Sequence, residues 1–169
     1  QAIALSPVSP AYVDGEPFAD TQYPNFLLQD KYGSYNTIIR RITGRFYGDA
    51  EITSELSFNS SFSYDLYAQS EDSFNGSLTP FQSSNGDAFA SNYTTENFIY
   101  SNYLEYEKEI GSDQNISVVV GTELNKSKRR SATVSGEQFP TDDFQTISSA
   151  AEIVSGTGGF TRYSFVSYF

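Results

Sequence analysis

The chain has 169 residues, enough for one domain with a sizeable core, and it contains neither cysteine nor histidine. This composition excludes a disulfide framework and the usual catalytic triad, and it removes the commonest zinc ligand. The formal net charge of −11 argues against nucleic acid as a partner, because phosphate binding needs a basic surface. No motif in the chain implies a cofactor.

Aromatic residues make up 16% of the chain, with 13 Tyr and 14 Phe, although the mean hydropathy of −0.42 is that of a polar chain. Such a mixture suits strands with one apolar and one polar face, as in a membrane β-barrel or an all-β secreted module. The chain contains no Met and no signal peptide or transmembrane-helix run. We therefore expect a mature secreted product or an internal fragment.

Residues 1–36 are predicted to form a long loop. Proline is spaced through this polar stretch, which also holds the turn dipeptide Asp14-Gly15. The prolines are Pro7, Pro10, Pro17 and Pro24.

The segments 37–53 and 56–69 alternate with a period of two, which indicates extended chain. Their even positions are apolar or small and their odd positions are mostly polar. We expect a hairpin turn of three or five residues centred on Glu55, because an odd number keeps the even residues of both strands on one face. In this register Arg45 lies opposite Asp65.

Residues 70–95 are predicted to form a second long loop, since Ser, Asn, Gly and Asp dominate them. Asn75-Gly76 and Asn85-Gly86 are turn signals within it. The spacing of its acidic and amide residues does not match a calcium-binding loop, so no metal site is predicted.

A second hairpin follows, with strands over 96–110 and 115–127 joined by a short turn over 111–114. Residues 128–160 are predicted to form a third long loop. Residues 161–169 alternate again and form the fifth predicted strand.

The predicted turns are short at one end of the strands, and the loops are long at the other end. Barrels of the outer-membrane type have short periplasmic turns and long extracellular loops. We therefore predict an all-β, antiparallel up-and-down meander that is part of a large transmembrane β-barrel. A soluble sandwich also alternates, but with shorter strands and with loops at both ends.

Six stretches of the chain together match one known family in order and spacing. They are residues 45–51 (RFYGDAE), 97–106 (NFIYSNYLEY), 111–113 (GSD), 120–124 (VGTEL), 138–144 (QFPTDDF) and 162–169 (RYSFVSYF). From about residue 37 onwards the chain resembles the barrel region of SusC/RagA-type TonB-dependent outer-membrane transporters.

The resemblance implies a multi-pass outer-membrane barrel of roughly 22 strands that imports glycans or oligopeptides. It implies a SusD-like surface lipoprotein as a partner, and energy supplied by TonB through a plug domain that is absent here. Five strands cannot close a barrel when the smallest have about eight, so we expect an internal fragment. The ending on Phe169 also imitates the last strand of an outer-membrane barrel, which leaves a true C-terminus open.

In such a barrel the even positions face lipid and the odd positions face the lumen. The predicted lumen-facing charges could contact the plug or the solute, or could simply be solvated wall residues: Arg45, Asp65, Glu105, Glu107 and Glu123. A basic cluster is predicted at the extracellular rim, near the phosphates of lipopolysaccharide. Its members are Arg40, Arg41, Lys126, Lys128, Arg129 and Arg130.

Two other functions compete with transport. A secreted carbohydrate-binding or adhesion module would pack the even face into a core, where Gly44, Gly48 and Ala50 leave thin packing. A glycosidase needs a pair of carboxylates at a fixed separation, and nothing in the sequence fixes one, so we predict no enzyme activity.

Five N-glycosylation sequons occur, three of them within predicted strands, and we attribute them to chance.

Overall fold

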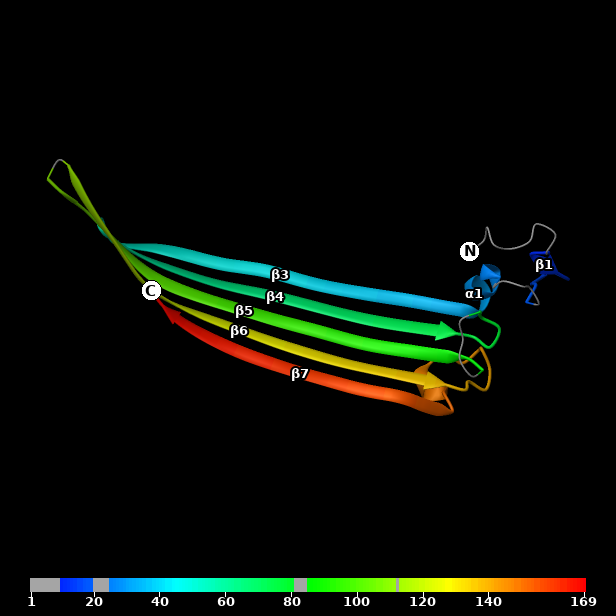
Figure 1. Ribbon diagram of the computed structural model, residues 1–169. Helices are drawn as coiled ribbons and strands as arrows, with labels where there is room; N and C mark the ends of the chain where they lie inside the picture. Colours follow the sequence, from blue (N-terminus) through cyan, green and yellow to red (C-terminus); the bar gives the residue numbers. More distant parts are fainter. Residues whose placement is uncertain (1–9, 20–24, 81–84, 112) are drawn as a thin grey trace. The chain divides into compact units, whose positions relative to one another are not determined.

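The computed structural model describes residues 10–19, 25–80, 85–111 and 113–169. Parts of the predicted loops at 1–9, 20–24 and 81–84, and Ser112 of the second hairpin turn, lie outside the described residues. Five strands form one sheet in the order β3-β4-β5-β6-β7, so each strand pairs with the next along the chain (Figure 1). The predicted all-β antiparallel meander is confirmed.

The elements follow one another along the chain with two small strands and one helix before the sheet. Their bounds are β1 Tyr12–Val13, β2 Glu16–Pro17, α1 Phe26–Tyr32, β3 Gly33–Thr53, β4 Leu56–Asn75, β5 Asp87–Ile110, β6 Gln114–Glu137, the 3-10 helix η2 Ile147–Ser149 and β7 Glu152–Tyr168.

All five strands of the sheet extend further toward the long loops than the sequence predicts. The loops predicted over 70–95 and 128–160 shrink to the connections 76–86 and 138–151. Polar residues of low strand propensity are held in these extensions by cross-strand pairs of side chains. Such pairs are Asn75 with Asp87, Ser91 with Thr133 and Ser135 with Ser155.

The N-terminal segment 1–36 was predicted as loop throughout, but its described part contains structure. Asp14 and Gly15 both have positive φ, 52° and 84°, and form the two-residue turn between β1 and β2, as a type I′ hairpin requires. The side chain of Asn25 accepts a hydrogen bond from Leu27 N at the start of α1 and donates to Ala11 O and Phe18 O. This buried amide therefore caps the helix and fastens the segment before it.

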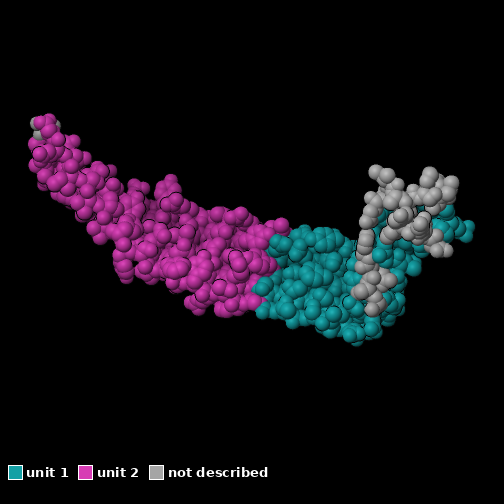
Figure 2. All heavy atoms as spheres, in the orientation of Figure 1, with its two compact units in different colours: residues 1–38, 69–92, 131–158 teal, residues 39–68, 93–130, 159–169 magenta. Residues whose placement is uncertain are grey.

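The chain divides into two compact units (Figure 2). The first unit comprises residues 1–38, 69–92 and 131–158, and the second unit comprises residues 39–68, 93–130 and 159–169. In the described part of the chain, every buried hydrophobic side chain belongs to the first unit. The two units therefore differ in how their apolar side chains are covered.

The core of the first unit lies beneath the connection 138–151. Phe139 is 2% exposed and meets the ring of Phe74 edge to face, with centroids 5.0 Å apart. Ala88 completes the buried cluster, and Ile147 and Ala150 pack against it. Gln138 N and Phe139 N also donate to Gly86 O and Asn85 O, so backbone bonds hold the connection where its aromatic side chain is buried.

In the second unit, Gly121 of β6 forms a close backbone pair with Phe169. Gly121 N donates to Phe169 O at 2.8 Å, and Phe169 N donates to Gly121 O at 3.1 Å. A Cβ on Gly121 would lie 2.6 Å from Cζ of Phe169 and 2.7 Å from Cβ of Tyr103. The aromatic ring of Phe169 thus occupies the space that a side chain would need.

Truncating Phe139 to alanine is expected to loosen the connection 138–151. A buried Phe→Ala change costs about 3–5 kcal/mol, so amide exchange in this segment should accelerate by about 100-fold or more. Hydrogen–deuterium exchange with mass spectrometry measures the effect. Phe144→Ala is the matched control, because Phe144 is 60% exposed and its loss should leave exchange unchanged.

Gly121→Ala is expected to destabilise the protein by about 1–3 kcal/mol, because the added methyl group overlaps Phe169 and Tyr103. Urea unfolding measures the change as a lower midpoint. Gly48→Ala serves as the control, since a Cβ there meets no atom within 4 Å. Equal midpoints for the two variants would show that the close approach at Gly121 is absent.

Candidate functional site

Side-chain contacts in the second unit separate its sheet into two faces. Phe98 on β5 contacts Phe62 and Tyr64 on β4, with ring centroids 6.3 and 5.0 Å apart. Odd residues meet odd residues in the same way, since Tyr67 contacts Tyr93 at 6.0 Å. We call these surfaces the even face and the odd face.

The even face carries apolar side chains that nothing in the described chain covers. We define the apolar belt as the even-face residues of β3 from Ile42 to Ile52 and their neighbours on β4, β5 and β6. Phe46, near the middle of the belt, is 73% exposed. Other exposed members are Ile42, Ile52, Phe58, Phe62, Tyr100, Leu104, Ile116, Val118 and Val120.

The odd face holds Asp65, but its partners differ from the predicted one. Oδ1 of Asp65 accepts from Nε of Arg41 at 3.0 Å and from the hydroxyl of Thr43 at 2.6 Å. Arg45 instead donates to Ser61 Oγ at 3.5 Å. The predicted Arg45–Asp65 pair is therefore wrong.

The turn explains part of this error. β3 ends at Thr53 and β4 begins at Leu56, so two residues connect them, rather than the predicted three or five. Two residues alone would place odd residues opposite even ones, whereas Arg41 and Asp65 share a face. Glu51 and Ser57 line one depression with Glu105 and Glu107, so an irregularity such as a β-bulge at the turn itself restores the parity and shifts the register.

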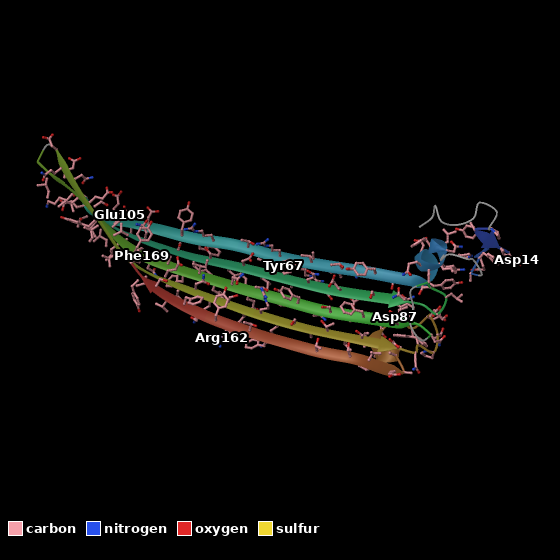
Figure 3. The ribbon with its side chains drawn as sticks, in the orientation of Figure 1. Asp14, Tyr67, Asp87, Glu105, Arg162 and Phe169 are labelled. Atoms are coloured by element: carbon pink, nitrogen blue, oxygen red, sulfur yellow. The ribbon has the colours of Figure 1, made fainter. Side chains whose placement is uncertain are left out.

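An aromatic and cationic stack lies further along the odd face. The guanidinium carbon of Arg129 lies 5.4 Å from the ring centroid of Tyr93, within the range of a cation–π contact. Tyr93 in turn contacts Tyr67, which Figure 3 labels on β4. The side chain of Arg129 therefore points away from the apolar belt.

Glu105 and Glu107, predicted as lumen-facing charges, lie with Glu51 and Glu55 around a depression of about 410 Å³ beside the turn. Glu107 N donates to Glu55 O at 2.8 Å, which aligns β5 with this turn. The carboxylate of Glu55 lies 3.4 Å from Nζ of Lys108 and accepts from the hydroxyl of Tyr106.

The predicted lumen-facing residues do not form one cluster. Arg45 on β3 and Asp65 on β4 have separate partners, while Glu105 and Glu107 border the acidic depression. No hydrogen bond or ion pair joins Glu123 to the other four within the described ranges. The sequence located these charges on strands but could not show which would meet.

The predicted basic cluster lies inside strands rather than at strand ends. β6 continues to Glu137 and β3 begins at Gly33, so Lys126, Lys128, Arg129 and Arg130 and the pair Arg40 and Arg41 are all internal. The cluster also divides between faces. Nζ of Lys128 lies 3.5 Å from Oε2 of Glu96, and Arg130 lies 5.4 Å from the Phe160 ring centroid, both on the even face.

Sequence reasoning missed the Lys108–Glu55 pair and the depression lined by Thr94, Glu96, Lys128 and Arg130. Lys108 was visible as a charged residue at an apolar position, which was the available signal. The second feature depends on the register of β5 with β6, which no local pattern specifies.

Among the described residues, neither α1 nor the 3-10 helix η2 has the length and apolar character of a bilayer-spanning helix. No group of three or more His, Cys, Asp or Glu side chains in the described ranges is arranged to hold a metal ion.

Comparison with solved structures shows the class of fold. The meander matches a part of each of three structures of the RagAB peptide importer or transporter. The TM-scores are 0.74 for its closed-closed state, 0.76 for its open-open state and 0.78 for a structure described as the RagAB peptide transporter. Sequence identities are 14%, 15% and 14%, so the likeness is one of fold.

The matches cover 82%, 93% and 93% of this chain, but only 16%, 17% and 18% of the matched chains. The chain therefore spans less than a fifth of the length of the structures that it resembles. No protein-family model and no curated protein matches the sequence.

A double-mutant cycle can test the observed register. Arg41 and Asp65 should couple by about 0.2–1 kcal/mol, as expected of an exposed ion pair, whereas Arg45 and Asp65 should not couple measurably. Urea unfolding of the alanine variants, single and double, supplies the free energies. Coupling of Asp65 to Arg45 alone would restore the register predicted from sequence.

Proposed function

We propose that the chain is part of a SusC/RagA-type TonB-dependent transporter of the outer membrane and forms five strands of its barrel wall. The observation that carries the proposal is the uncovered apolar belt on the even face. In water, such a surface would cause aggregation, because contiguous exposed apolar patches promote association between protein molecules. In a bilayer, the acyl chains cover it.

The length of the belt supports this placement. Extended chain rises about 3.3 Å per residue, so the ten steps from Ile42 to Ile52 span about 33 Å along β3. A strand tilted by about 40° would then cross about 25 Å of hydrocarbon, the height of the apolar band of outer-membrane barrels. The short turn at Ser54 and Glu55 would face the periplasm, and the connections 76–86 and 138–151 would be extracellular.

In this orientation the odd face lines the lumen. Its carboxylates, its hydroxyls and the Tyr67–Tyr93–Arg129 stack offer polar and aromatic contacts to a passing solute. Because the matched structures are described as those of a peptide importer or peptide transporter, oligopeptides are the favoured nutrient class over glycans. We assign transport, and no catalytic step, to this wall.

The partners follow from the same proposal. A SusD-like lipoprotein would cover the extracellular end, and TonB would act through a plug domain that these five strands do not include. The surrounding outer membrane supplies the lipid, with lipopolysaccharide in its outer leaflet. If the proposal is correct, the SusD-like lipoprotein should remain bound when the full-length protein is purified in detergent.

A secreted binding module is the rival function. It requires a second layer over the even face, and no described residue supplies one in the second unit. The two functions therefore differ in whether lipid or protein touches Phe46.

Phe46→Lys should destabilise the full-length protein by about 2–4 kcal/mol in phospholipid vesicles, as expected of a lysine near the bilayer midplane. Tyr47→Lys is the matched control, because Tyr47 is the next residue on β3, is 79% exposed and lies on the odd face. Its effect should stay within about 0.5 kcal/mol, the range of surface substitutions.

Urea titration in vesicles, followed by heat-modified electrophoretic mobility, measures both variants. A protein that stays monomeric and folded without detergent or lipid, with Phe46→Lys neutral, would refute the membrane placement.

A further inference from the structure

The six basic residues predicted at the rim fall on opposite faces of the sheet. Arg41 pairs with Asp65, and Arg129 stacks on Tyr93, so both belong to the odd face. Lys128 and Arg130 contact Glu96 and Phe160 on the even face. Only the even-face members can touch the lipid that the proposed function places against the apolar belt.

Lys128 and Arg130 border a depression of about 270 Å³, and Thr94 and Glu96 complete its lining. Lys128 keeps 45% of its side chain exposed and Glu96 keeps 33%, so both groups can meet a ligand from outside. Arg130 has an aromatic neighbour in Phe160 but no carboxylate partner among the described residues. No carboxylate of the described residues therefore neutralises its positive charge.

The register adds a further cation to this surface. Gly121 and Phe169 are directly paired through two backbone hydrogen bonds, and the contact of Arg130 with Phe160 fits the same alignment of β6 with β7. Seven steps from the Gly121–Phe169 pair, Lys128 lies beside Arg162, which Figure 3 labels on β7. Since Phe160 is on the even face, Arg162 shares that face.

On the even face, charged residues directly follow the end of the apolar belt; they are Glu96, Lys128, Arg130 and Arg162. Phe98 is two residues from Glu96 on the same face and contacts Phe62 and Tyr64. Arg40 likewise precedes Ile42 by two positions on β3. A molecule that extends along the face would therefore meet apolar side chains first and cationic side chains next.

We propose that Lys128 and Arg130, with the hydroxyl of Thr94, form a binding site on the even face for the phosphate group of a lipid headgroup. This inference rests on the proposed function, because it needs acyl chains along the apolar belt. A phosphorylated lipid has acyl chains that suit the apolar belt and a phosphate that suits the cationic side chains beyond its end. Ammonium and guanidinium groups favour phosphate oxygens, and the guanidinium can bind two of them at once.

Glu96 gives the site a distinctive property. Its carboxylate competes with the phosphate for Lys128, so breaking the ion pair from either side should have opposite effects on lipid binding. Removal of the lysine charge weakens binding, and removal of the glutamate charge strengthens it. A purely structural ion pair would make both changes act in the same direction.

The test uses the full-length protein refolded into phosphatidylcholine vesicles that contain diphosphoryl lipid A. Lipid A retained after transfer to detergent is counted by native mass spectrometry. Lys128→Gln/Arg130→Gln should lower retention about tenfold or more, since each basic residue near the headgroups contributes appreciably. Glu96→Gln should raise retention, and Arg129→Gln, on the odd face, should leave it unchanged.

Equal losses for Arg129→Gln and for the double variant would overturn the site, and so would a loss for Glu96→Gln. Two further arms identify the ligand. Dephosphorylated lipid A should be retained weakly by wild type and variants alike. Displacement of lipid A by inorganic phosphate would assign the site to free phosphate and overturn the lipid assignment.

The heat-modified mobility shift keeps this test separate from the test of membrane insertion. A protein that folds in vesicles but shows no difference between the variants would overturn the phosphate site and leave the barrel placement intact. A protein that fails to require lipid would overturn both.

Discussion

Pairing of neighbouring strands leaves each side chain of the sheet only two directions, and from β3 to β6 of the second unit most of the exposed large apolar side chains take the even one. In the first unit, the connection 138–151 returns over the sheet and buries Phe74, Ala88 and Phe139. In the second unit no described segment does so, and the apolar side chains stay exposed. The same alternation thus produces a core in one unit and a lipid-facing surface in the proposed function of the other.

The period of two was sufficient to predict strands, their order and the meander, because it reflects a backbone geometry that every strand shares. It failed at the strand ends, where the Ser, Asn, Asp and Thr residues within 70–75 and 87–95 resemble loop residues. Those residues become strand only through partners on neighbouring strands, such as Asp87 for Asn75. Strand length at these ends is therefore a tertiary property, and local composition underestimates it.

The candidate site shows the same division. Parity correctly placed Asp65 on the same face as Arg41. It could not choose between Arg41 and Arg45, because both are odd and the difference depends on an irregularity near a two-residue turn. Parity also carried enough information to divide the basic cluster: Lys128 and Arg130 are even, whereas Arg41 and Arg129 are odd. The prediction of a single basic cluster at the rim did not use this difference in parity.

Lys108 interrupts the apolar alternation of β5, and its ammonium group reaches Glu55 at the turn. Its carbon chain can lie along apolar neighbours while its charge stays at the polar end, as long basic side chains do at membrane boundaries. On the proposed placement, the apolar belt is then bordered by cations of the same face on both sides, Lys108 toward the turn and Arg40 toward the loops. The strands would be fixed in depth, so a thicker or thinner bilayer would have to adjust its own thickness around them.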